Sequence, residues 1–187
     1  MMLLPVYCQR LSSLLEIKSM ELSDRILVRK IGAILRRNEQ TLSVAESCTG
    51  GLLGMLLTSE PGSSKWFTGG VIAYSDRIKT DLLGVPTAMI QEFGAVSNEV
   101  VTVMAGGIRS LTGTDYSISI SGIAGPAGGT REKPVGTVCM AVDRDGSCTA
   151  EMKHFPHSRS QSREVVRKAS ASYLLSMLYS RLREDGK

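Results

Sequence analysis

The chain has 187 residues, of which 42% are hydrophobic and 21% are charged. This length and composition are typical of one globular domain with a sizeable core, and they exclude two full domains. The net charge is +4, but Lys and Arg are interspersed with Asp and Glu, so binding to nucleic acid is permitted and not indicated. No stretch approaches the roughly 20 apolar residues needed to cross a bilayer, so no membrane partner is expected.

The cysteines and the first residues bear on the cellular compartment. The apolar opening MMLLPVY is shorter than the core of a secretory signal, and no C-x-x-C spacing occurs. We therefore expect reduced thiols in the cytoplasm. We also expect residues 1–19 to be an N-terminal extension, either disordered or a misassigned start, and residues 20–187 to form a single domain. The four cysteines are Cys8, Cys48, Cys139 and Cys148.

The first half of the chain alternates helical and extended patterns. From residue 21 to 37, apolar residues recur at helical spacing with charged residues on the other face. Gly69-Gly70, inside the second extended run, indicates a bulge or a close approach of another backbone. The predicted elements are, in order, helix 21–37, strand 41–45, helix 50–59, strand 66–74, helix 76–83, helix 86–93 and helix 97–111.

The second half changes character. An alternating strand over 115–121 leads into a glycine-rich loop over 122–130. Strands 135–142 and 148–155 then flank Asp-Arg-Asp-Gly, a strong hairpin signal, and a last helix covers 161–183. Helices that alternate with strands, followed by a hairpin, predict an α/β fold: a three-layer α/β/α sandwich on a mixed, mostly parallel sheet with a late antiparallel hairpin.

The segment LSVAESCTGG, residues 42–51, is the most informative stretch. A β-prone run ends there in a Ser-Cys-Thr-Gly-Gly turn that opens into an apolar helical pattern. A helix N-terminus has unpaired N–H donors and about half a positive charge, so it favours a phosphate or the oxyanion of an acyl transfer. The turn is therefore a candidate active site. The alternative is that Ser47 or Thr49 only caps the helix.

Ser47 and Lys79 are the candidate nucleophile and base. Ser47 follows the first strand, where a side chain can project into a crevice at the carboxyl edge of the sheet, and its hydroxyl needs a base. Lys79 lies about one turn into the helix that Ser75-Asp76 begins, so adjacent strands would bring it to the same edge. The base must be a neutral amine, which burial favours and a nearby Asp76 or Glu46 would oppose. The alternative is a solvated helix lysine.

Cysteine and histidine compete for these roles. A thiol at a helix N-terminus has a lowered pKa, which makes Cys48 a second candidate nucleophile, unless it is a small buried apolar residue. Neighbouring residues in a turn point in different directions, so only one of Ser47 and Cys48 can face the pocket. We expect His154 and His157, the two histidines of the chain, to be surface or loop residues and not members of a Ser-His-Asp triad.

A second glycine-rich loop, SGIAGPAGG at 121–129, follows a strand. It is neither a dinucleotide fingerprint nor a Walker loop, because neither a helical pattern nor Gly-Lys-Ser/Thr follows it. Its amides and the Ser121 hydroxyl can form a nest for a phosphate or ribose, or the glycines only allow the chain to turn. Three arginines near the last helix either neutralise such an anion or form a solvated basic face, and Arg163 is the best placed. They are Arg159, Arg163 and Arg167.

Seven motifs in unbroken order resemble one family, the C-terminal domain of CinA proteins, which includes stand-alone, PncC-like nicotinamide-nucleotide amidohydrolases. The resemblance covers about residues 21–183, while residues 1–19 match nothing in the pattern. The separate amino-terminal domain of longer CinA proteins has no counterpart in it. The motifs are AESCTGG (45–51), PGSSKWF (61–67), Tyr74-Ser75-x-x-x-Lys79, GAVS (94–97), SGIAGPAGG (121–129), KPVGT (133–137) and Arg163-x-x-x-Arg167.

The resemblance implies an α/β/α fold and deamidation of nicotinamide mononucleotide to nicotinate mononucleotide, with release of ammonia in pyridine-nucleotide recycling. It also implies a catalytic Ser47–Lys79 dyad that works through an acyl-enzyme. We expect no metal and no cofactor, with N–H groups near Cys48 and Thr49 holding the oxyanion. The expected substrate-binding residues are Cys48, Thr49, Gly50, Gly51, Tyr74, Ser121, Gly122, Gly125 and Arg163.

Two other functions remain open at this point. One is a binding or regulatory module linked to competence and recombination, which would bind a nucleotide without turnover. The other is an amidase for a different phosphorylated amide. The apolar faces of the helices also favour a homodimer.

Overall fold

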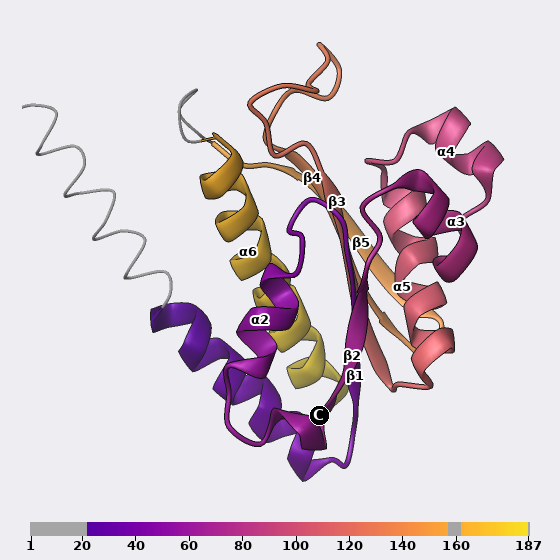
Figure 1. The fold of residues 1–187 in the computed structure, drawn as a ribbon. Coiled ribbons are helices and arrows are strands. Elements are labelled where there is room, and N and C mark those ends of the chain that lie inside the picture. Colours follow the sequence, from indigo (N-terminus) through magenta and orange to yellow (C-terminus); the bar gives the residue numbers. More distant parts are fainter. Residues whose placement is uncertain (1–21, 157–161, 187) are drawn as a thin grey trace, which may run out of the picture.

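The computed structural model describes residues 22–156 and 162–186 (Figure 1). The expected extension, residues 1–19, lies outside the described residues, as do His157 and Arg159. A helix over 22–37 comes first. The elements that follow are β1 (Leu42–Glu46), α2 (Leu52–Thr58), the 3₁₀ turn η1 (Ser63–Lys65), β2 (Phe67–Ile72), α3 (Asp76–Leu83), α4 (Thr87–Phe93), α5 (Asn98–Thr112), β3 (Tyr116–Gly122), β4 (Thr137–Arg144), β5 (Ser147–His154) and α6 (Ser162–Asp185).

The five strands form one mixed sheet in the order β2-β1-β3-β4-β5. β1 pairs in parallel with β2 and β3, whereas the pairs β3–β4 and β4–β5 are antiparallel. The late hairpin is therefore confirmed, but its turn is shorter than expected. Only Asp145 and Gly146 separate β4 from β5, and both have positive φ, of 51° and 82°. Such two-residue turns match the right-handed twist of the strands, so pairing continues through Arg144 and Ser147.

Helices cover both faces of the sheet, which confirms the α/β/α sandwich (Figure 1). Helix 22–37, α2 and α6 pack on one face around a core that includes Leu35, Leu53 and Leu174. α5, α3 and α4 cover the other face, where Met104 and Ile108 of α5 are fully buried. Among the described residues, no helix is both long and apolar enough to span a membrane.

The parallel strands bring the candidate site residues to one edge. The register of β1 and β2 shifts between Leu42 and Ser43, which confirms the bulge expected from the Gly69-Gly70 pair. A Cβ on Gly70 would lie 2.5 Å from the carbonyl oxygen of Val44, so this position requires glycine. The close approach keeps β2 tight against β1 and places their carboxyl ends side by side.

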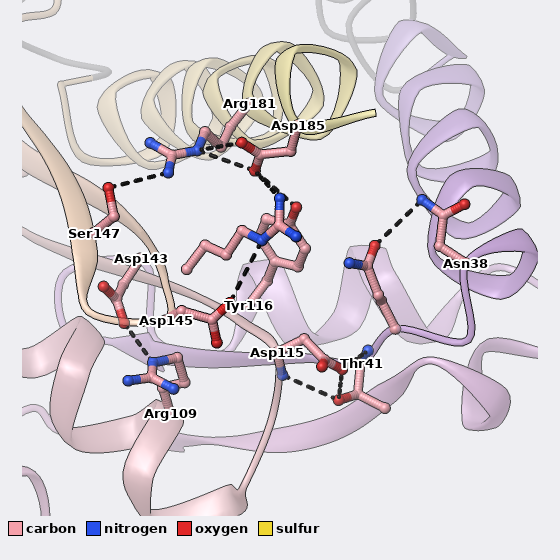
Figure 2. A network of polar contacts seen from close by, with 12 residues as sticks. Asn38, Thr41, Arg109, Asp115, Tyr116, Asp143, Asp145, Ser147, Arg181 and Asp185 are labelled. Atoms are coloured by element: carbon pink, nitrogen blue, oxygen red, sulfur yellow. Dashed lines mark hydrogen bonds and ion pairs between the residues drawn. The ribbon is translucent and has the colours of Figure 1, made fainter. Parts of the chain in front are cut away.

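A polar network closes the opposite end of the sheet (Figure 2). The Thr41 N–H and hydroxyl both donate to Asp115, which returns its own N–H to the Thr41 hydroxyl. The Tyr116 hydroxyl donates to Asp185 at 2.8 Å, and Arg144 and Arg181 contact the same carboxylate at 3.1 Å. Burial opposes ionisation of Asp185, but these hydrogen bonds outweigh it and lower its pKa. The network therefore ties the start of β3 to the last turn of α6.

Candidate active site

A cavity of about 280 Å³ lies at the carboxyl ends of β1, β2 and β3. Two backbone hydrogen bonds extend the sheet beyond the strands, from the Ser47 N–H to Ile120 and from the Ala73 N–H to Glu46. They fix the directions in which the chain leaves the sheet toward Ser47 and toward Tyr74. The cavity is lined by Ser47, Cys48, Tyr74, Asp76, Lys79, Ala95, Val96, Ser121, Gly122, Ala124 and Arg163.

The lining includes most of the residues singled out from the sequence, but not all of them. Thr49, Gly50, Gly51 and Gly125 do not line the cavity. Conversely, four residues that line the cavity were not selected as site residues from the sequence: Asp76, Ala95, Val96 and Ala124.

Lys79 is buried and lies in the first turn of α3. The helix begins where the sequence predicts, because the Ser75 hydroxyl accepts a hydrogen bond from the Ile78 N–H at 3.3 Å and so caps it. The Lys79 side chain is only 2% exposed. Its amine donates to Asp76 at 3.3 Å and to the Tyr74 carbonyl at 3.5 Å, and the described contacts include no hydrogen bond from it to Ser47. The Lys79 amine and the Ser47 hydroxyl therefore line one cavity without a hydrogen bond between them.

Ser47 is the candidate nucleophile that the geometry favours over Cys48. The Ser47 side chain lines the cavity, and no hydrogen bond among the described residues engages its hydroxyl. Burial raises the pKa of the Cys48 thiol from 9.0 to about 12, against a partial lowering by a backbone hydrogen bond. The expected lowering of the Cys48 pKa is therefore wrong, and the thiol stays protonated at neutral pH. It packs closely on Gly122, where a Cβ would lie 3.1 Å from the sulfur.

The N-terminus of α2, which was expected to bind an anionic ligand, is occupied by the carboxylate of Glu46. The buried side chain of Glu46 turns back and accepts hydrogen bonds from the N–H groups of Gly51, Leu53 and Gly54, at 2.9, 3.2 and 2.8 Å. This contact takes up the donors that were expected to attract a ligand. The charge of Glu46 also raises the pKa of Cys48, by less than burial does. The sequence analysis missed this role of Glu46.

Two other N–H groups are available in the turn itself. Within the described residues, the amides of Cys48 and Thr49 donate to no backbone carbonyl, although the Cys48 amide contacts its own thiol. The Thr49 hydroxyl is also buried without a partner in this part of the chain. Buried donors are nearly always paired in folded proteins, so these amides are candidates for receiving an oxyanion. The candidate donors thus lie in the turn before α2 and not at the helix N-terminus.

Two arginines of α6 reach across to the site. Arg167 donates through Nε, at 3.1 Å, and through Nη2 to the carbonyl of Thr49, and so holds the turn in place. Arg163, one helical turn earlier, donates to the Tyr74 hydroxyl at 3.1 Å and to the Gly125 carbonyl at 3.3 Å. Arg163 therefore joins three segments that lie far apart in the sequence, and neither arginine is only part of a solvated face.

The back wall of the cavity is the segment between α4 and α5. The Ser121 hydroxyl donates to the carbonyl of Ala95 at 2.7 Å, and the Lys133 amine donates to the carbonyls of Phe93 and Val96 at 2.7 and 2.8 Å. Lys133 thus fastens the loop after β3 to this wall. The motifs GAVS (94–97) and KPVGT (133–137) were noted in the sequence. Their role in forming the cavity depends on the hydrogen bonds of Lys133 to a segment about 40 residues earlier, which the spacing of motifs does not predict.

The remaining candidates lie away from the cavity. His154 is exposed at the end of β5 and does not line the site. The described part of the chain contains no group of three or more His, Cys, Asp or Glu side chains placed to hold a metal ion. The three described cysteines, Cys48, Cys139 and Cys148, are free thiols.

The fold and the site define an α/β domain with a serine and a buried lysine in one pocket at the carboxyl edge of its sheet. Residues 24–182 match the CinA C-terminal domain, and the chain belongs to this family. CinA-like proteins from Parasynechococcus marenigrum and Synechocystis are 50% and 48% identical to it over 86% and 83% of this chain. The aligned regions are only 38% and 37% of those relatives' lengths.

Solved structures of the same superfamily have the same fold. The competence or damage-inducible protein from Enterobacter asburiae superposes with a TM-score of 0.81 at 33% identity, over 85% of this chain and 98% of that one. The competence/damage inducible protein CihA from Agrobacterium tumefaciens gives a TM-score of 0.79 at 34% identity, over 86% and 96%.

Proposed function

We propose that the protein hydrolyses the carboxamide of nicotinamide mononucleotide, giving nicotinate mononucleotide and ammonia. The observation that carries the proposal is a buried lysine amine in the same cavity as a serine hydroxyl without a described partner. Membership of the CinA C-terminal domain family supports it.

The first step of the proposed reaction forms an acyl-enzyme. The neutral amine of Lys79 moves to the Ser47 hydroxyl and takes its proton as the oxygen attacks the carboxamide carbon. The carbonyl oxygen becomes an oxyanion, which the N–H groups of Cys48 and Thr49 stabilise. The Lys79 ammonium then gives its proton to the departing nitrogen. Ammonia leaves, and an ester to Ser47 remains.

The second step restores the enzyme. A water molecule gives a proton to the neutral Lys79 amine and attacks the ester carbon, and the same amides hold the new oxyanion. Collapse of this intermediate breaks the bond to Ser47, whose oxygen regains a proton from Lys79. The product is a carboxylic acid, which ionises at neutral pH. Each half-reaction therefore uses one base that alternates between two protonation states.

Tyr74, Arg163 and the loop 121–129 are the proposed nucleotide-binding elements. The Tyr74 side chain is exposed and stands beside the cavity, where its ring can stack on a pyridine. Arg163 lies next to it and brings positive charge to the rim, which suits the phosphate of a mononucleotide. This arrangement favours a phosphorylated substrate over free nicotinamide.

An ammonia-release assay on the purified chain tests this proposal with three amides: nicotinamide mononucleotide, nicotinamide and the intact dinucleotide. We expect turnover of the mononucleotide and little of the other two. Turnover of none of them, together with calorimetric binding of a nucleotide, would contradict the amidase proposal. Turnover of only another phosphorylated amide would retain the chemistry and change the substrate.

A binding or regulatory module is the second candidate function. The names of the solved relatives refer to competence and damage induction, and the Lys79 amine donates a hydrogen bond to Asp76 and none to Ser47 among the described contacts. Nucleotide binding without ammonia release is the result that would favour it.

We also propose that the protein works in the cytoplasm as a homodimer. The free state of Cys48, Cys139 and Cys148 fits a reducing compartment. Light scattering coupled to gel filtration tests the dimer, because a monomeric mass at micromolar concentration would contradict it.

A further inference from the structure

Asp76 lines the cavity and holds the proposed base. Its carboxylate lies 3.3 Å from the Lys79 amine, one helical turn away on α3. The two side chains differ sharply in environment, since Lys79 is 2% exposed and Asp76 is 60% exposed. The ion pair therefore joins a buried amine to a carboxylate at the rim.

Among the described residues that line the cavity, Asp76 is the only one with a carboxylate. The other titratable and charged groups that line the same cavity are the Cys48 thiol, the Tyr74 phenol and the Arg163 guanidinium. The nearby Glu46 points to the N-terminus of α2. α4 and α5 contribute apolar side chains to the core that they share with α3. Asp76 is thus the anionic group that favours the ammonium form of the base.

We propose that Asp76 is a positioning residue that holds Lys79 as an ammonium in the empty site and so sets the lowest pH at which the amidase works. The proposal rests on the proposed function, because the reaction needs the neutral amine. Removing the carboxylate makes the amine easier to deprotonate, so the variant gains activity at low pH, whereas purely structural damage would only lower activity.

The pH profile of kcat/KM for Asp76→Asn tests the proposal. The opposite charges lie only 3.3 Å apart, so loss of the carboxylate should move the acid limb of the profile to lower pH. At a pH one unit below the wild-type limb, we expect the variant to turn over about three to ten times faster than the wild type. Asp76→Ser should give the same shift, which covers the case that the Asn variant fails to fold.

Asp81→Asn is the matched control. Asp81 lies on the same helix, carries the same charge and pairs with Arg77 at 3.0 Å, but it does not line the cavity. Its removal should leave the acid limb in place. An unchanged limb in the two Asp76 variants, or an equal shift in Asp81→Asn, would overturn the proposal.

A readout that needs no turnover separates this proposal from the proposed function. In lysine-labelled protein, the carbon signal next to the Lys79 amine, assigned with Lys79→Met, reports loss of its proton. We expect that loss at lower pH in Asp76→Asn than in the wild type. If no amide is turned over but the signal shifts, the amidase proposal fails and the role of Asp76 in charging Lys79 stands. An unshifted signal overturns the role of Asp76.

Discussion

The amino ends of the parallel strands β1–β3 (the amino edge of the sheet) and their carboxyl ends (the carboxyl edge) differ in how completely their polar groups are paired. At the amino edge, Thr41 and Asp115 exchange hydrogen bonds, and Asp185 receives bonds from Tyr116 and two arginines (Figure 2). At the carboxyl edge, the Thr49 hydroxyl is buried without a described partner, and Lys79 has only contacts of 3.3 and 3.5 Å.

This difference indicates that one edge mainly stabilises the fold and the other mainly serves the reaction. Saturated networks fix one arrangement and resist change, whereas unpaired donors cost free energy unless a ligand uses them. The amino edge therefore stabilises the fold, and the carboxyl edge keeps groups ready for a substrate. Substitutions at one edge should consequently change stability, and substitutions at the other should change activity.

The largest effect should come from Lys79→Met at the carboxyl edge. Loss of a general base lowers kcat by about 10³-fold, while the thermal midpoint should stay the same or rise, because a buried amine is replaced by an apolar chain of similar length. Ammonia release and thermal unfolding measure the two effects. Lys65→Met, at an exposed lysine, is the control. A similar loss of activity in both variants would contradict the assignment.

At the amino edge, Asp143→Ala should do the reverse. Asp143 is buried and accepts a hydrogen bond from Arg109 at 2.6 Å. Its removal leaves the guanidinium without its partner and should lower the free energy of unfolding by about 2 kcal/mol. Urea unfolding measures the loss, and kcat/KM should stay within about twofold of the wild type. A large drop in turnover without a loss of stability would contradict the claim that the amino edge affects stability and not activity.

The smallest effect should come from Tyr116→Phe. The variant loses one buried hydrogen bond to Asp185 and about 1 kcal/mol of stability at pH 7. The pKa of Asp185 is lowered in the folded state, so its contribution is complete above the unfolded value of about 3.9 and disappears as the pH falls through the folded value. The difference between variant and wild type should therefore shrink as the pH falls through the lowered pKa of Asp185 in the folded state. A constant difference down to pH 2 would show that the ionised form of Asp185 is not what Tyr116 stabilises.

Local signals predicted much of the fold and part of the site. The capping serine before α3 is a short-range feature, so the sequence located the start of that helix and the position of Lys79 in its first turn. The same holds for the bulge at Gly69-Gly70. The hairpin was predicted with too long a turn, because the sequence does not show that pairing continues through Arg144 and Ser147.

Features that depend on the direction of a side chain could not be predicted. The predicted strand ended at residue 45, and the sequence suggested for Glu46 only a possible effect on Lys79, yet its side chain turns to the α2 amides. Cys48 follows a strand at a glycine-rich turn, and its burial, with a smaller contribution from Glu46, reverses the expected effect on its pKa. Lys133 fastens a wall of the cavity that is distant in sequence.

The most direct test of the central claim compares Ser47→Ala with Cys48→Ala, two neighbouring substitutions in the same turn. Ammonia release from nicotinamide mononucleotide should fall by about 10⁴-fold in the first variant and by less than about tenfold in the second. Binding of nicotinate mononucleotide, measured by calorimetry, should persist in both variants. Retained turnover in Ser47→Ala, or a loss confined to Cys48→Ala, would contradict the assignment of Ser47 as the nucleophile.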